Sequence, residues 1–292
     1  MPETLPAPLP PALTPAQQNS VINVVRRAAK AEILPRFRQL SSADIRTKSR
    51  ADDLVTAADT AAEAMITRAL QIAFPSALVV GEEAVSSKPE LLDGIAEAQL
   101  AFHIDPVDGT WNFAHGLAMF GVIIAATRYG KPVFGMIYDP IADDWAIAGE
   151  EGTPQIQRPF GPARDLHAAM GKPIEQLSGY IPLHLFAQAQ KVKLAATFPG
   201  FARTQTLRCS AHEYRMIAQG HVDFLLTESL HPWDHAAGVL ICANAGCHVE
   251  MLDGGDYSAA RHTGNLLVAP DRATWNRLQK VFSFLTEDSK TD

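Results

Sequence analysis

The stretch Ala101-Phe-His-Ile-Asp105-Pro-Val-Asp108-Gly-Thr110 decides how the fold is interpreted, because an apolar run breaks there into two carboxylates, a glycine and a threonine. Residues 102–104 can extend a buried strand, and Pro106 lacks an N–H, so pairing should end there with both acids beyond the strand tip. Carboxylates in one tight turn repel unless a cation lies between them, and hard oxygen ligands favour Mg²⁺ or Mn²⁺ over zinc. Gly109 and Thr110 then offer backbone N–H groups suited to an anion. The motif alone fits an ordinary acidic turn as well as a metal site.

The composition predicts a soluble globular protein. The 292 residues are 47% apolar, which is enough for one large domain or two smaller halves. A formal charge of −7 without a Lys/Arg cluster argues against nucleic acid as a partner, although metal ions could still attract a phosphorylated substrate. The three cysteines, Cys209, Cys242 and Cys247, form no even-numbered disulfide framework, which favours a reducing compartment. No long apolar run and no signal segment is found, so a cytoplasmic protein without a membrane partner is expected.

The chain is expected to form two halves behind a tail. Residues 1–13 are rich in proline and lack a periodic pattern, which predicts a flexible tail. Residues 14–150 are expected to form an N-terminal α+β half and residues 151–292 a C-terminal α/β half. The segment 149–175 is rich in Gly, Pro and charge, which is typical of a connection.

The sequence predicts where two helices begin. Thr14 and Gln17 have the spacing of a capping box around Pro15, and Thr56 and Asp59 have the same N-cap and N3 spacing. Helix capping is therefore an alternative to a catalytic role for Asp59. Further predicted elements are a strand at 77–80, an antiparallel meander at 120–148, a helix at 210–218, a strand at 222–226, a helix beginning at Asp234, a strand at 266–268 and a helix at 274–285. This alternation predicts a layered α/β or α+β architecture.

Acidic residues recur where these elements end or begin. The strand at 77–80 stops at Gly81-Glu82-Glu83, so acids follow a strand for a second time, which weakens an interpretation as plain surface charge. Asp234 lies at a helix start, where an acid is usually a cap. The small residues of Ala236-Ala237-Gly238 would let that helix approach another backbone closely.

Taken together, Gly81-Glu82-Glu83, Asp105-Pro-Val-Asp108-Gly-Thr110 and Trp233-Asp234-His235-Ala236-Ala237-Gly238 resemble, in order and spacing, the signature of the inositol monophosphatase family. The resemblance runs from about Val24 to the C-terminus, and it includes Lys48-Ser49 and residues 54–59. It implies an α+β fold built as a layered α-β-α-β-α sandwich. It also implies a Mg²⁺-dependent phosphomonoesterase, commonly a homodimer, that acts on a small phosphorylated metabolite.

The resemblance also implies roles for residues that match the family. Two or three Mg²⁺ ions, with Mn²⁺ as a substitute, would be held by Glu82, Asp105, the carbonyl of Val107, Asp108 and Asp234. Asp105 would bridge two of the ions. Glu83 would contact the metal ligands without binding an ion itself. Thr110 and Asp59 would orient a metal-activated water as the nucleophile, while the N–H groups of Gly109 and Thr110 would hold phosphate oxygens. Asp234 would thus come from the C-terminal half and most other ligands from the N-terminal half.

Three other interpretations remain to be weighed. Haloacid dehalogenase-type phosphatases carry D-x-D-G-T, but the spacing here is D-x-x-D and the Glu82-Glu83 pair has no place in that scheme. A zinc site formed by His231 and His235 would need one helix through both, which Pro232 opposes. A member of the same family that binds a phosphorylated ligand or a partner without hydrolysing it is the third.

The substrate is less defined than the reaction. The family's Gly-Ser before a C-terminal helix appears here as Arg208-Cys209. The glutamate that contacts inositol hydroxyls in the family falls at Thr227, or at Glu228 if the register is one residue along. Arg208, Thr227 and Asp108 are thus candidate substrate contacts, with Arg208 able to meet a second anionic group. These changes put myo-inositol 1-phosphate in doubt and leave sugar phosphates, histidinol phosphate, nucleotide 3′-phosphates and NADP as candidates.

Overall fold

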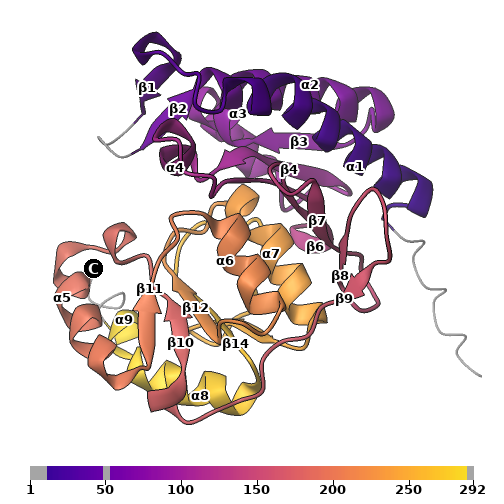
Figure 1. Cartoon of the computed structure of the whole chain (residues 1–292). Coiled ribbons are helices and arrows are strands. Elements are labelled where there is room, and N and C mark those ends of the chain that lie inside the picture. Colours follow the sequence, from indigo (N-terminus) through magenta and orange to yellow (C-terminus); the bar gives the residue numbers. More distant parts are fainter. Residues whose placement is uncertain (1–11, 49–52, 288–292) are drawn as a thin grey trace, which may run out of the picture.

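The computed structural model describes residues 12–48 and 53–287, and it shows helices and sheets stacked in alternating layers (Figure 1). The expected α+β fold with α-β-α-β-α layering is confirmed. Residues 1–11 of the predicted tail lie outside the described residues, whereas Leu13 is buried in the core. The division into halves at residue 150 stays a prediction. Within the described residues, no helix has the length and apolar character needed to cross a membrane.

The first sheet has the strand order β3-β4-β5-β6-β7-β8-β9, in which β3 and β4 are parallel and the other neighbours antiparallel. Its strands are β3 (Leu78–Gly81), β4 (Ala101–Asp108), β5 (Gly121–Arg128), β6 (Lys131–Asp139), β7 (Asp144–Ala148), β8 (Gln155–Gln157) and β9 (Arg164–Asp165). The meander predicted at 120–148 is confirmed as β5, β6 and β7. The segment at 149–175, expected to be only a connection, adds β8 and β9.

Helices cover both faces of this sheet (Figure 1). The outer helices are α1 (Pro15–Ala28) and α2 (Ala57–Ala73), and both begin at the capping boxes predicted from the sequence. The inner helices are α6 (Ser210–Ala218) and α7 (Pro232–Asn244). Successive side chains of a strand point to opposite faces, so Val122 and Ile124 pack with α1 and α2, while Ile123 packs with α6 and α7. The central strands are therefore apolar on both faces.

The second sheet lies beyond α6 and α7 and has the order β11-β10-β12-β14-β13 (Figure 1). Its strands are β10 (Ser178–Tyr180), β11 (Arg203–Gln205), β12 (Phe224–Thr227), β13 (His248–Met251) and β14 (Leu266–Ala269). The helices α5 (Gln188–Thr197), α8 (Arg272–Val281) and α9 (Phe284–Glu287) complete the outer layer. Leu225 of β12 packs toward α6 and α7, and Leu226 packs toward α8, so this sheet also has two apolar faces. The core thus consists of helix layers alternating with buried sheets.

Three short elements connect the first sheet to the site. They are the hairpin of β1 (Ile45–Thr47) and β2 (Leu54–Thr56), the helix α3 (Glu82–Ser87) directly after β3, and the helix α4 (Thr110–Ala114) directly after β4. In the charged loop of the hairpin, residues 49–52 lie outside the described residues, while Lys48 is described.

The predicted end of a strand at Pro106 is wrong. β4 continues to Asp108, with Asp105 opposite Ile123 and Asp108 opposite Gly121. Because β4 advances three residues while β5 advances two, β4 carries a β-bulge between its two aspartates. Pro106 lies in this bulge, where the ladder is interrupted and its missing N–H costs no hydrogen bond. Both acids therefore belong to the strand and are buried with it.

Candidate metal centre and active site

The two carboxylates of β4 are held firmly at the inner end of the strand. Asp105 is 2% and Asp108 is 7% exposed. The Val107 N–H donates to Asp105 Oδ1 over 3.1 Å. Asp108 Oδ2 accepts hydrogen bonds from Ala211 N at 2.5 Å and from Cys209 Sγ at 3.1 Å. Asp108 is thereby tied to the first turn of α6, which the sequence did not suggest.

Gly109 turns the chain from β4 into α4. Its φ of +86° is in the left-handed region, and a Cβ there would lie 2.9 Å from the Met119 carbonyl oxygen and 3.2 Å from Cys209 Cβ. Both the conformation and the crowding require glycine. The Thr110 side chain then points back toward the strand, where its Oγ1 lies 3.0 Å from the Val107 carbonyl oxygen.

Asp234 joins the two strand acids from α7. The ligand oxygens of Asp105, Asp108 and Asp234 lie within 4.8 Å of one another. The helix begins at Pro232 with His231 as N-cap, so Asp234 lies in the first turn and does not itself start the helix as predicted. A proline is preferred at the first helical position because its missing N–H has no helical partner there. Asp234 thus meets two acids that lie more than a hundred residues earlier in the sequence.

Among the described ion pairs, none joins a basic residue to the acid cluster. Burial raises the pKa of Asp105, Asp108 and Asp234, and the pKa of Asp105 and Asp234 is raised further by the neighbouring carboxylates, Glu82 among them. An ionised carboxylate buried beside others is unfavourable unless a cation compensates it. Three acids with converging oxygens are the donor set that hard divalent cations such as Mg²⁺ prefer. The site therefore fits a metal ion.

The glutamate pair begins α3 and faces the same cleft. Lys48 Nζ donates to Glu82 Oε1 over 2.8 Å and to Glu83 Oε1 over 2.6 Å. Glu82 lines the cleft together with Asp108 and Asp234. The pair is thus bound to a lysine, and Glu82 stands beside the three-acid cluster without being one of its three converging ligands.

Asp59 links the start of α2 to Thr110. Its Oδ2 accepts hydrogen bonds from Thr56 N at 2.9 Å and Thr56 Oγ1 at 2.5 Å, while its Oδ1 accepts one from Thr110 Oγ1 at 3.1 Å. Burial raises the pKa of Asp59 to about 7, and the charges of Glu82 and Glu83 also raise it, although the hydrogen bonds from Thr56 lower it. Asp59 therefore caps the start of α2 and also contacts Thr110 of the candidate site.

Glu63 is a site residue that sequence reasoning missed. It lies one helical turn after Asp59, is 5% exposed, and accepts hydrogen bonds from the N–H groups of Glu83 and Ala84, each over 2.8 Å. Its carboxylate therefore caps the helix that presents the glutamate pair. The signal in the sequence was an acid inside the buried stripe of α2, where a charged side chain needs partners.

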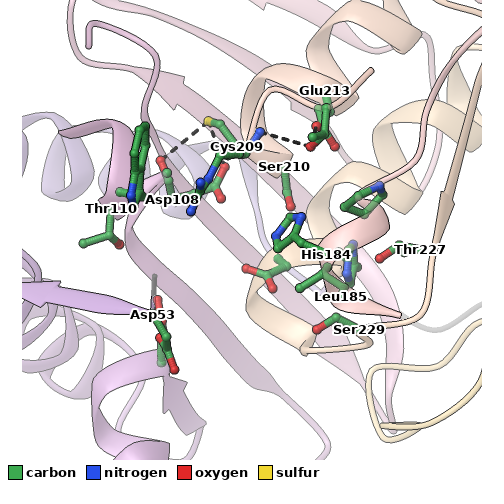
Figure 2. Close-up of a pocket in the computed structure, with 18 of the residues that line it drawn as sticks. Asp53, Asp108, Thr110, His184, Leu185, Cys209, Ser210, Glu213, Thr227 and Ser229 are labelled. Carbon is green, nitrogen blue, oxygen red and sulfur yellow. Dashed lines mark hydrogen bonds between the residues drawn. The ribbon is translucent and has the colours of Figure 1, made fainter. Parts of the chain in front are cut away.

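The cleft beside the acids extends toward the second sheet. Figure 2 shows Asp53, Asp108 and Thr110 on one side of it and Glu213, Thr227 and Ser229 on the other. Arg208 and Thr227, the two candidate substrate contacts beyond residue 150, line this cleft. Thr227 is buried at the end of β12. Arg208 has a φ of +55°, and its guanidinium carbon lies 4.2 Å from the Trp111 ring centroid.

The zinc interpretation finds no support in the described histidines. His231 precedes α7 and stacks on Trp233 with a centroid distance of 4.9 Å. His235 lies within the helix, where its Nδ1 is 2.9 Å from the Tyr214 hydroxyl and burial lowers its pKa to about 3. The two rings thus have separate partners.

The layered fold and the sequence both place the chain in a known protein family. A sequence profile described as "Inositol monophosphatase family" matches residues 17–286, and the chain belongs to this family. Over 271 residues it is 29% identical to the Nus factor SuhB of Vibrio cholerae serotype O1, covering 89% of this chain and 95% of the relative. Over 222 residues it is 28% identical to an inositol-1-monophosphatase of Bacillus subtilis, covering 74% and 79%. The solved structure of a Thermotoga maritima IMPase has the same fold, with a TM-score of 0.77 at 21% identity, covering 94% of this chain and 99% of that one.

Proposed function

We propose that the protein is a Mg²⁺-dependent phosphomonoesterase that releases phosphate from a small phosphorylated metabolite by the attack of water. The family supports a phosphatase. The observation that carries the proposal is the cluster of Asp105, Asp108 and Asp234 together with the hydrogen-bonded pair of Thr110 and Asp59. Each group reaches the same cleft, the cluster through Asp108 and Asp234 and the pair through Thr110. A phosphatase needs positive charge for the phosphate oxygens and a group that takes a proton from water, and these two features supply the means for both.

Mg²⁺ would be held by Asp105, Asp108 and Asp234, with Glu82 and the Val107 carbonyl completing the proposed ligand set. When bound, the metal supplies the charge that neutralises the phosphate oxygens and makes water more acidic. The described ligands fit this role because they are buried carboxylates with raised pKa values and no basic residue paired to the three-acid cluster among the described ion pairs. Two or three ions and a substitution by Mn²⁺ belong to the same proposal.

Other groups of the protein would position the water, accept its proton and bind the phosphate. Thr110 Oγ1 and Asp59 Oδ1 would orient the attacking water, and Asp59 would take up its proton. A pKa near 7 suits a general base at neutral pH, because the group is then substantially ionised yet still basic. The backbone N–H groups of Gly109 and Thr110 would hold phosphate oxygens. Glu83 would act indirectly, through Lys48, by fixing the position of Glu82.

Arg208 is proposed as a contact for a second anionic group of the substrate. A non-glycine residue at a φ of +55° is uncommon and costs about 1 kcal/mol or more. The side chain compensates by stacking on Trp111, which follows the phosphate-binding turn. Thr227 is proposed as a neighbouring contact in the same cleft, and Asp108 as a contact for both metal and substrate.

Phosphate release with Mg²⁺ across a panel of phosphomonoesters tests the proposed function. The panel should include myo-inositol 1-phosphate, hexose phosphates, histidinol phosphate, nucleotide phosphates and NADP, with Asp108→Asn as the inactive control. Metal-dependent release by the wild-type protein that disappears in the variant supports the proposal. The absence of release from every ester refutes it.

A second candidate function is regulatory, because a relative at 29% identity is named a Nus factor. In that case the protein would bind a phosphorylated ligand or another macromolecule without turnover, and Asp108→Asn would leave its cellular role unchanged. The homodimer and the cytoplasmic location expected from the sequence stay predictions.

A further inference from the structure

Another carboxylate lines the cleft outside the cluster of Asp105, Asp108 and Asp234. Glu213 lies on α6, is 4% exposed, and lines the same cleft as Asp108 and Thr110. In Figure 2 it stands with Ser210 on the side of the cleft away from Thr110. None of the steps described above uses it.

The position of this carboxylate is fixed by the loop before α6. Thr206 Oγ1 donates to Glu213 Oε1 over 2.9 Å, and Leu207 N donates to the same oxygen over 2.6 Å. An ionised carboxylate offers about four acceptor positions on two oxygens. These two donors, together with the backbone N–H of Arg208, orient the group, and three donors still leave one of its acceptor positions for a ligand.

The charge of Glu213 is poorly compensated by the protein. Among the described residues it forms no ion pair with a lysine, arginine or histidine. Burial raises its pKa to about 7, and the nearby charge of Asp108 raises it further. A buried carboxylate with only neutral donors gains from an additional donor, and more if that donor is charged. Water or a ligand group in the cleft must supply it.

We propose that Glu213 is a specificity-determining residue, which accepts a hydrogen bond from a hydroxyl or ammonium group on the leaving alcohol of the substrate. The preferred substrates are then phosphate esters of polyols or amino alcohols. The inference rests on the proposed phosphatase function, and it follows from the arrangement of the cleft. With the phosphate at the Gly109–Thr110 turn, the alcohol extends toward the opposite wall, where Glu213 lies.

Substitution of Glu213 by glutamine separates this role from a structural one. The amide carbonyl of Glu213→Gln still accepts from Thr206 and Leu207, while an NH₂ group replaces the second oxygen. The assay measures kcat/KM of the full chain with Mg²⁺ for glycerol 2-phosphate, O-phosphoethanolamine and phenyl phosphate, whose leaving group has no donor. We expect the ratio of kcat/KM for a donor-bearing ester to that for phenyl phosphate to fall about tenfold or more. Glu97→Gln, at an exposed position, is the matched control and should keep the wild-type ratio.

The three esters test the proposal by which of them lose kcat/KM in the Glu213→Gln variant. A fall confined to the glycerol ester identifies a hydroxyl, and one confined to the ethanolamine ester identifies an ammonium; either supports the proposal. An equal loss for all three esters shows that Glu213 only orders the loop, and an unchanged ratio removes it from substrate recognition; either overturns the proposal. Glu213→Asp, which withdraws the carboxylate by one methylene, gives the same decision if the glutamine variant does not fold. If the wild-type protein hydrolyses none of the esters, including phenyl phosphate, the phosphatase function fails, and this role fails with it.

Discussion

Replacing Gly81 by alanine should disturb the site although this residue offers no ligand. Its φ of −101° is open to any residue, so the backbone conformation does not require glycine. An added Cβ, however, would lie 2.3 Å from Glu63 Cδ and 2.5 Å from each carboxylate oxygen. Because Glu63 is buried and bonded to the N–H groups of Glu83 and Ala84, its carboxylate would have to move and abandon the start of α3.

The expected cost follows from the contacts that are lost. Overpacking costs about 1–3 kcal/mol and each hydrogen bond to a charged group contributes about 1.5–3 kcal/mol, so Gly81→Ala should lower the free energy of unfolding by about 3 kcal/mol. Glu63→Ala removes the same hydrogen bonds but leaves space for a Cβ at residue 81. In that background, Gly81→Ala should therefore cost little, and the two substitutions should couple by nearly the whole cost, about 3 kcal/mol.

The double-mutant cycle is measured by urea unfolding of the four proteins, and Mn²⁺ titration reports the metal site in the same samples. Both single variants should bind Mn²⁺ more weakly than wild type, because α3 no longer holds Glu82 in place. Glu97→Gln, an exposed glutamate substitution, is the control for the loss of one charge. Additive effects, within about 0.5 kcal/mol, would show that Gly81 and Glu63 do not act through one contact.

Three further predictions concern single carboxylates. Asp108→Asn and Asp234→Asn should each abolish most phosphate release and weaken Mn²⁺ binding while circular dichroism stays unchanged, and near-normal turnover in either would contradict the metal assignment. Asp59→Asn should reduce kcat with a smaller loss of Mn²⁺ affinity, and a large binding defect in titration would argue against its role as a base. The two hydrogen bonds from Arg26 hold the pKa of Asp143 below its usual range, so this pair stabilises the fold above about pH 4 and the contribution is lost as the pH falls further. Asp143→Asn should accordingly destabilise the protein more at pH 7 than at pH 3, as urea midpoints would show, and an equal effect at both would refute the pairing.

Features that depend on neighbouring residues were predictable from the sequence. The capping boxes of α1 and α2 follow from spacings of three residues, and the structure has both. The meander and the helix at 210–218 follow from the hydrophobic pattern and its turn residues. The family followed from motif order, and the sequence profile confirms it. Such local patterns determine which elements form.

Features that depend on packing between distant elements were not predictable. Pro106 was expected to end its strand, because the bulge that accommodates it depends on pairing with β5. The contacts of Glu63 with α3 and of Ala211 with Asp108 join residues 20 and 103 positions apart. No periodicity signals such contacts, and the only trace of Glu63 was an acid among apolar neighbours.

The geometry of the acid cluster depends on how α7 packs between the sheets. Asp105 and Asp108 belong to the first sheet, whereas Asp234 belongs to a helix that must stay in a fixed position against it. Close contacts hold that helix: a Cβ at Gly135 would lie 2.8 Å from Ala237 Cα, and one at Gly238 would lie 2.2 Å from the Tyr214 ring. Because these contacts leave no space for a methyl group, the helix cannot shift without losing packing on both sides. The small residues of α7 therefore set the spacing of the three acids, and with it the geometry offered to the proposed metal ion, although none of them is a proposed ligand.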